Sequence, residues 1–245
     1  MLERPQGAQG GTNPPAALML EWSARAAIVA VFTALAALNL AGIYHMAPPD
    51  GPERLLALAA RLANFMFLIL VAATALTRLS PILKAKGIEP RVSALLGTFL
   101  CAGLAMLPKT ELGPVLSITS TLLIIVGSVS SFIVLRWLGK SFSILAEARR
   151  LVTSGPYKVV RHPLYLCEGI ALLGVALQVI SPLAVAIALI IVLIQFRRMI
   201  NEEVVLNSAF PEYGAYAART PRVVPALVAG FHSGSNPVMD DSQAQ

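Results

Sequence analysis

The stretch SPLAVAIALIIVLIQFRRMINEEVVL, residues 181–206, decides the fold class of this chain. A tight Ser-Pro turn precedes an apolar run, and the charges of Arg198, Glu202 and Glu203 follow with no breaking residue. Lipid cannot satisfy the backbone groups of an open strand, so an apolar run of this length predicts a helix. We expect one long helix that leaves the membrane and carries its charged end into the cytoplasm.

Five further apolar segments precede this one, and the composition agrees with a membrane protein. The chain is 56% hydrophobic and 13% charged, whereas soluble domains carry about 25% charged residues. The sequence therefore predicts an all-α integral membrane helix bundle of about six transmembrane helices. The third and fifth segments are short, so either can be tilted or span incompletely. The predicted segments are residues 22–46, 55–76, 92–107, 115–138, 164–180 and 183–200.

Positive charge predicts how the bundle lies in the membrane. Basic residues concentrate in the loops at 78–91 and 139–162 and at the start of the C-terminal region. With six crossings and both termini in the cytoplasm, these basic pieces fall on one side, as cytoplasmic loops do. We expect no nucleic-acid partner. The expected regions are a disordered lead at 1–20, helices one to four at 21–136, a core at 137–225 and a disordered tail at 226–245.

The segment GPYKVVRHPLY, residues 155–165, brings charged and aromatic groups up against two apolar runs. Its Gly-Pro pair forces a turn, and Pro163 fits the first turn of the fifth helix. His162 then lies at the helix entrance with Tyr165 about one turn further in. Unpaired N–H groups at such an entrance attract anions. Anchoring of lipid headgroups by these side chains is the alternative interpretation.

The charged end of the sixth segment has a structural and a functional interpretation. Arg198 and Glu202 stand four residues apart, and an exposed ion pair at this spacing contributes only about 0.3–0.5 kcal/mol. Functionally, Glu202 would face a cationic part of a ligand and Arg198 an acidic substrate. Glu168, inside the fifth segment, is a site hypothesis by default, or it pairs with Arg161. The aromatic segment 210–216 either caps a cofactor pocket or lies on the headgroups.

Several other classes of site lack support in the sequence. The three histidines are scattered with no metal-ligand spacing, so we expect no metal. The two cysteines fit small buried apolar residues. There is no glycine-rich nucleotide fingerprint after a strand and no serine elbow before a helix.

Taken together, the motifs resemble a known enzyme family. LVTSGPY at 151–157, RHPLY at 161–165, Arg198 and the Glu pair at 202–203 are similar to the isoprenylcysteine carboxyl methyltransferase family. That family belongs to a wider group of membrane methyltransferases that includes phospholipid methyltransferases. The resemblance covers residues 137–225. It implies S-adenosyl-L-methionine (SAM) bound in a C-terminal cytoplasmic cofactor pocket, at the membrane face and without a Rossmann domain. The chain resembles the bacterial branch of the family, which implies a bacterial inner-membrane protein.

The resemblance also implies roles for individual residues. Arg198 would bind the substrate, and Arg198 with Glu202 would be catalytic. The residues that it places at the cofactor are Leu151, Val152, Tyr157, His162, Pro163, Leu164, Tyr165 and Glu202.

Methyl transfer from a sulfonium is an in-line displacement, in which positioning can contribute about 7–11 kcal/mol. A carboxylate acceptor is already a nucleophile and needs a cation to hold it. We therefore expect Arg198→Ala to abolish transfer to a carboxylate and Glu203→Gln to be mild. The expected acceptor is a lipid-like carboxylate, such as an isoprenylcysteine-type α-carboxyl, that reaches the site from the bilayer.

Two alternatives stay open. The same scaffold could methylate an amine or a thiol, as a phospholipid N-methyltransferase or a small-thiol S-methyltransferase. Glu203 or Glu168 would then matter more, because such acceptors lose a proton. A non-enzymatic membrane transporter or assembly protein is the alternative from another class, although the polar residues concentrate in the last third of the chain.

Overall fold

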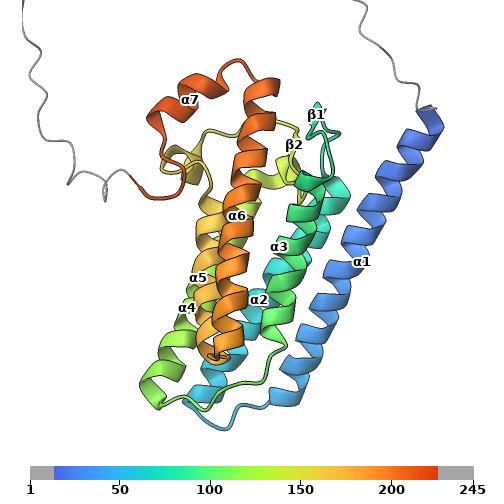
Figure 1. The fold of residues 1–245 in the computed structure, drawn as a ribbon. Helices are drawn as coiled ribbons and strands as arrows, with labels where there is room; N and C mark the ends of the chain where they lie inside the picture. The colour runs from blue at the N-terminus through green and yellow to red at the C-terminus, as the bar shows by residue number, and fades with distance from the viewer. Residues whose placement is uncertain (1–13, 226–245) are drawn as a thin grey trace, which may run out of the picture.

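The fold is an all-α bundle in which each predicted apolar segment forms one helix (Figure 1). The computed structural model describes residues 14–225. Six long helices run alternately up and down, and a short helix, α7 (Tyr213–Arg219), covers one end. The expected integral membrane bundle is thus confirmed. The long helices are α1 (Pro14–Met46), α2 (Pro52–Thr77), α3 (Glu89–Ala105), α4 (Pro114–Leu138), α5 (Pro163–Gln178) and α6 (Pro182–Ala209).

Four of the described helices are long and apolar enough to cross a membrane. They are α1 from Arg25 onward, α2, α4 and α6. Helices α3 and α5 have 17 and 16 residues, less than the about 20 residues that a perpendicular crossing needs. The short third and fifth apolar segments had predicted that these two helices would be shorter than the others.

Helix starts follow the local chemistry of the sequence. Five of the long helices, α2 to α6, carry proline in their first two positions, where a missing N–H costs nothing. Ser181 caps α6 by accepting a hydrogen bond from the Ala184 N–H at 3.1 Å. Helix α6 then continues unbroken to Ala209, which confirms the long helix expected there.

The outer boundaries of the chain were predicted less well. Helix α1 begins at Pro14, so residues 14–20 of the expected disordered lead are helical. The rest of that lead, residues 1–13, and the expected tail at 226–245 lie outside the described residues.

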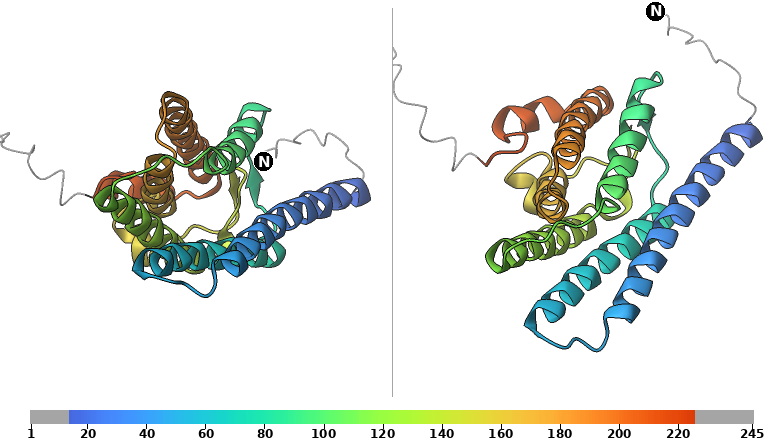
Figure 2. Two further views of the ribbon diagram at one scale, coloured as in Figure 1. Left: turned by 90° about the horizontal axis from the view of Figure 1, so that it is seen from below. Right: turned by 60° about the horizontal axis from the view of Figure 1, so that its bottom comes forward.

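Close helix contacts divide the bundle into two groups. Helix α4 packs on α5 and α2, and α2 packs on α1, whereas α3 packs mainly on α6. At the α4–α5 contact, the Ser120 hydroxyl donates to the Gly174 carbonyl at 3.1 Å. The two helices are too close for a side chain at Gly174, because a Cβ built there lies 2.7 Å from the backbone carbonyl oxygen of Ser120. Figure 2 shows α3 and α6 standing across from α1 and α2.

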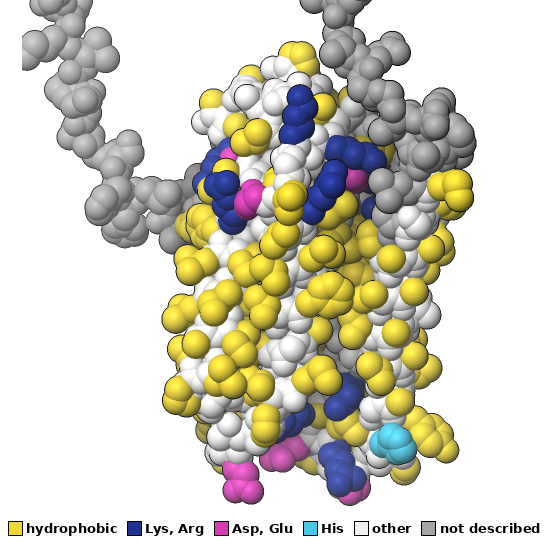
Figure 3. Space-filling view, turned by 45° about the vertical axis from the view of Figure 1, so that its right-hand side comes forward, with side chains coloured by type: hydrophobic (Ala, Val, Ile, Leu, Met, Phe, Trp, Pro, Cys, Tyr) yellow, Lys and Arg dark blue, Asp and Glu magenta, His cyan; other side chains and the backbone are white. Residues whose placement is uncertain are grey.

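The two ends of the bundle differ in their loops. We call the end that carries α7 the site end and the opposite end, with the loops at 47–51, 106–113 and 179–181, the far end. At the site end a two-residue strand, β1 (Leu83–Lys84), pairs antiparallel with β2 (Glu147–Ala148). In Figure 3 charged side chains gather near both ends, and apolar side chains cover the surface between them. The site end also holds two 3-10 turns, η1 (Gly139–Ser141) and η2 (Gly155–Lys158).

Candidate active site

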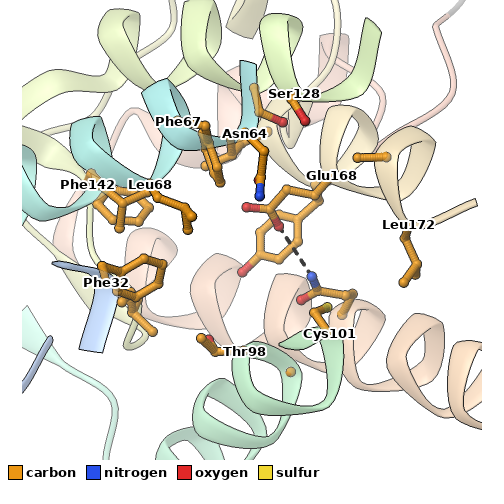
Figure 4. A pocket seen from close by; sticks show the side chains of 18 of the residues that line it. Phe32, Asn64, Phe67, Leu68, Thr98, Cys101, Ser128, Phe142, Glu168 and Leu172 are labelled. Carbon is orange, nitrogen blue, oxygen red and sulfur yellow. Dashed lines mark hydrogen bonds between the residues drawn. The ribbon is translucent and has the colours of Figure 1, made fainter. Parts of the chain in front are cut away.

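A cavity of about 660 Å³ lies between the two helix groups. Ligand pockets of proteins span about 300–1,000 Å³, so a small molecule fits. Figure 4 shows Asn64 and Glu168 inside it, with Phe32, Phe67 and Leu68 on the adjacent wall. At the site end the cavity reaches the residues that the sequence motifs single out. The candidate site is this end of the cavity.

The turn before α5 has the geometry that its sequence predicts. Gly155 has φ +59°, in the left-handed region that favours glycine. The face of Trp137 occupies the space that a side chain at this position would need. The 3-10 turn that follows buries Tyr157 and leads to His162 at the start of α5.

Glu203 stands at the centre of a cluster of charges beside the cavity. Its carboxylate accepts two hydrogen bonds from Arg222, at 2.9 and 2.7 Å. Arg161 Nη1 lies 3.2 Å from the same carboxylate, and His162 Nε2 lies 2.9 Å from it. Its hydrogen bond to Glu203 raises the pKa of Arg222. One carboxylate thus balances two guanidinium groups and orients the histidine ring.

The backbone joins the same two segments. The Arg161 N–H donates to the Pro221 carbonyl at 2.8 Å, and the His162 N–H donates to the Arg222 carbonyl at 3.0 Å. Residues 220–222 therefore close over the loop that precedes α5. This contact was not predicted, because nothing in the sequence pattern around Arg222 marks a partner.

Glu202 faces the cavity on the other side of the His162 ring. Tyr165 donates a hydrogen bond to its carboxylate, and His162 Nδ1 lies 3.9 Å from it. The residues expected to meet at one small molecule, His162 and Glu202, are thus adjacent. The Glu202 carboxylate is partly exposed and lines the cavity, and the hydrogen bond from Tyr165 orients it.

Arg198 lies one turn before Glu202 on α6 and also lines the cavity. It donates to the Gln195 side chain at 2.7 Å and to the Ile144 carbonyl at 3.2 Å. Its guanidinium carbon stands 5.2 Å from the centre of the Tyr165 ring, within the range of a cation–π contact. Among the described residues no ion pair forms between Arg198 and Glu202, so the exposed i,i+4 pair considered from the sequence is absent.

Glu168 is held differently from the pairing that the sequence suggested. It accepts a hydrogen bond from Gln195 at 3.3 Å inside the cavity. The pairing with Arg161 is wrong, because Arg161 binds Glu203 instead. A carboxylate, an amide and a guanidinium therefore follow one another along the cavity wall, from Glu168 through Gln195 to Arg198.

Arg149 is a cavity-lining residue whose position the sequence reasoning did not explain. Its side chain is fully buried and pairs with Glu147 at 2.5 Å. Its Nε and Nη1 atoms are buried without a hydrogen-bond partner. Buried donors of this kind are available to an acceptor on a bound molecule. The β1–β2 pair positions Arg149, and two-residue strands leave no periodic signal in a sequence.

Helix α7 covers the site end with two tyrosines. The Tyr216 hydroxyl donates to the Tyr157 carbonyl at 2.7 Å, and Tyr213 also lines the cavity. Burial raises the pKa of Tyr213 and of Tyr216 to about 12. Both rings are therefore neutral at physiological pH. Two tyrosines of the aromatic segment thus line the cavity.

Most of the expected site residues meet at this end of the cavity. Pro163 is buried at the start of α5 and is not among the residues that line the cavity. Glu203 is not a lining residue either, so its role is to hold its neighbours. The expected residues that line the cavity are Leu151, Val152, Tyr157, His162, Leu164, Tyr165, Arg198 and Glu202.

Among residues 14–225, no group of three or more histidine, cysteine, aspartate or glutamate side chains could hold a metal ion.

Comparison with known proteins bears on the same region. Residues 109–213 match the model of a family described as phospholipid methyltransferase. The matched segment runs from the loop before α4 to the start of α7 and includes Arg198 and Glu202. This is the wider group to which the resemblance seen in the motifs belongs, and the match does not single out the isoprenylcysteine family within it. The match supports a membrane methyltransferase.

Two curated bacterial proteins are similar over a shorter stretch. The cobalt-zinc-cadmium resistance protein CzcN of Cupriavidus metallidurans is 41% identical over 78 residues, which is 31% of this chain and 36% of that protein. The nickel-cobalt-cadmium resistance protein NccN of Alcaligenes xylosoxydans xylosoxydans is 38% identical over 82 residues, or 33% of this chain and 38% of that protein. The match spans little more than a third of the length of either relative.

Proposed function

We propose that this chain is a SAM-dependent membrane methyltransferase that acts on a lipid-like carboxylate, such as an isoprenylcysteine-type α-carboxyl. The observation that carries the proposal is the pair Arg198 and Glu202. These two opposite charges line one cavity from adjacent turns of α6, and Tyr165 contacts both. Such a pair suits a reaction between an anionic acceptor and a cationic methyl donor.

The residues present fit SAM. Its carboxylate requires a cation with free donors, and Arg149 offers two buried nitrogens without partners. Its positive charge requires a carboxylate, and Glu202 faces the cavity within reach of His162. Its adenine requires an apolar and aromatic wall, which Leu151, Val152 and Tyr157 supply. These features support the expected cofactor set, with Arg149 added to it.

When bound, SAM supplies an electrophilic methyl group on a sulfonium. The protein then has to align the acceptor, exclude water and balance charge, and positioning of this kind can contribute about 7–11 kcal/mol. Arg198 holds the acceptor carboxylate, which attacks without losing a proton. Glu202, fixed by the Tyr165 hydroxyl, stabilises positive charge beside it. Tyr213 and Tyr216 close the site end and keep water out.

The apolar part of the acceptor lies in the cavity between the helices, where Phe32, Phe67 and Leu68 form the wall. We infer that the site end faces the cytoplasm, because the basic loops at 78–91 and 139–162 lie there and cytoplasmic loops are enriched in lysine and arginine. SAM then enters from the cytoplasm, while the acceptor enters from the bilayer.

Glu168 favours a second candidate on the same scaffold. A carboxylate in the cavity, 3.3 Å from the Gln195 amide, suits an acceptor that carries an N–H. Methylation of a phospholipid amine or of a small thiol needs a base, and Glu168 is placed to accept the proton. This candidate differs from the first in the residue on which turnover depends.

The experiment compares both acceptor classes in one assay. The purified chain is incubated with methyl-labelled SAM and, in parallel, prenylcysteine, phosphatidylethanolamine or a simple thiol. We expect label in the prenylcysteine ester, and we expect Arg198→Ala to lower it by about 100-fold or more, as the loss of one transition-state donor does. Arg197→Ala is the matched control, because Arg197 is exposed on α6 and pairs with Glu89 outside the cavity.

The outcomes separate the candidates. Label in the amine or thiol that depends on Glu168 and not on Arg198 selects the second candidate. If SAM neither stabilises the protein against heat nor labels any acceptor, the enzyme proposal fails.

A further inference from the structure

The cavity does not end at the candidate active site. Its lining includes Met46 at the end of α1, Gln178 at the end of α5 and Lys109 in the loop between α3 and α4. All three belong to the far end, opposite α7 (Figure 1). The cavity therefore runs the length of the bundle and has a second polar mouth that methyl transfer at the site end does not use.

Two cations line this far mouth. Arg61 of α2 and Lys109 both border the cavity. Burial, and after it the positive charge of Arg61, lowers the pKa of Lys109. Among residues 14–225 no acidic side chain lies within 4.0 Å of either cation. By contrast, Arg54 on the same end of α2 pairs with Asp50 at 2.9 Å.

The helix packing provides space for the arginine. The Arg61 guanidinium lies against Gly42 of α1, where a Cβ would stand 2.9 Å from its central carbon. Any side chain at Gly42 would displace it. Asn39, nearly one turn before on α1, also lines the cavity and has a buried side-chain oxygen with no partner. The polar groups at this mouth are therefore held in place by α1 and α2.

Beyond these cations the cavity wall is largely apolar. Leu35, Leu38 and Ala57 lie along α1 and α2, and Ala105 and Met106 lie at the end of α3. A soluble anion would satisfy Arg61 and Lys109 but leave this wall in contact with water. A molecule with an anionic head and a hydrocarbon chain satisfies both.

We propose that the far mouth of the cavity is a second binding site, at which Arg61 and Lys109 hold the phosphate or carboxylate headgroup of an anionic membrane lipid while its chain occupies the apolar part of the cavity. The two mouths then take different ligands. The site end contains carboxylates that balance its cations, whereas no acidic residue of the far end is among the described residues that line the cavity.

The test measures lipid retention and needs no catalytic activity. The full chain is purified in detergent with equal amounts of phosphatidylglycerol and phosphatidylcholine, and retained lipid is quantified by native mass spectrometry. We expect about a tenfold preference for phosphatidylglycerol, the size that one hydrogen-bonded charge supports. We expect Arg61→Gln with Lys109→Gln to reduce the preference below about twofold.

Controls keep the result interpretable. Arg54→Gln removes a cation from the same end that is already paired with Asp50, and it should keep the full preference. Lys109→Gln alone, in an exposed loop, leaves the bundle intact and should lower the preference to about threefold. An unchanged melting temperature in each variant establishes that the bundle is folded.

Three results would overturn the proposal. The first is a preference that survives in the double variant, and the second is equal loss in Arg54→Gln. The third is displacement of the retained phosphatidylglycerol by inorganic phosphate alone, which would mean that the site takes a soluble anion and not a lipid.

Discussion

Glu203→Gln should destabilise the fold, because the Glu203 carboxylate is the anion that two guanidinium groups and a histidine share. The mild effect expected from the sequence concerns methyl transfer to a carboxylate and not folding stability. In the structure Glu203 is only 12% exposed and balances Arg161 and Arg222 while it holds His162. The substitution keeps the shape of the side chain and removes its charge. Two guanidinium groups would then stand together without an anion.

The size of the effect follows from these contacts. A hydrogen bond to a charged group contributes about 1.5–3 kcal/mol. The Arg222 side chain is 35% exposed, so solvent reduces its share to about 1 kcal/mol or less. The side chains of Arg161 and His162 are only 16% and 5% exposed. Their interactions with Glu203 therefore contribute more to stability, and more is lost when its charge is removed. We expect Glu203→Gln to destabilise the fold by about 3 kcal/mol, at the lower edge of the 3–5 kcal/mol for breaking a buried pair.

Denaturant unfolding of the purified protein in detergent measures this loss. Asp50→Asn is the control, because its ion pair with Arg54 is exposed on both sides and should contribute less than about 0.5 kcal/mol. Trypsin provides a second measurement. Once Arg222 is released, cleavage after Arg219 and Arg222 should accelerate in Glu203→Gln and not in Asp50→Asn. A loss below about 1 kcal/mol, or equal losses in both variants, would refute this reasoning.

Three other predictions follow from close contacts and from burial. Gly174→Ala should destabilise the fold by about 1–3 kcal/mol in the same unfolding assay, because its Cβ would press on the Ser120 carbonyl; Gly169→Ala on the same helix has open space and should not destabilise. Tyr216→Phe should weaken SAM binding, measured by calorimetry, by about 1 kcal/mol, because the hydrogen bond to the Tyr157 carbonyl is lost; unchanged affinity would mean that α7 does not cap the cofactor. The pKa of Tyr213 and Tyr216 is about 12 in the folded chain and about 10 when unfolded, so stability is full below pH 10 and falls as pH rises toward 12; a flat unfolding free energy over that range would contradict their burial.

The sequence predicted the helices well because each rests on a local property. Apolar runs fix where helices lie, and prolines fix where they begin. The unbroken run from residue 183 through Leu206 predicted the continuation of α6 beyond its apolar part. The meeting of His162 with Glu202 was also predictable, since both stand at the site end of antiparallel neighbouring helices.

Side-chain partners could not be predicted in the same way. Arg161, about two turns before Glu168, is the cation nearest to it along the chain, so the sequence favoured that pairing on proximity alone. The actual partner, Gln195, depends on the rotation of α6 about its axis. Arg149 and Arg222 lie in irregular segments whose path is set by long-range backbone contacts. The periodic spacing of apolar residues in a sequence gives no information about such contacts.

The backbone pairing of residues 161–162 with 221–222 has a consequence for how the protein is made. During synthesis, α1 to α5 leave the ribosome before Pro221 is translated. These helices therefore enter the membrane while the loop at 155–162 still lacks its backbone hydrogen bonds to residues 221–222. Under the proposed function, the cofactor pocket would be complete only after almost all of the described residues have been translated. Membrane insertion and cofactor binding would then be separate steps, and only the second would depend on the supply of cofactor.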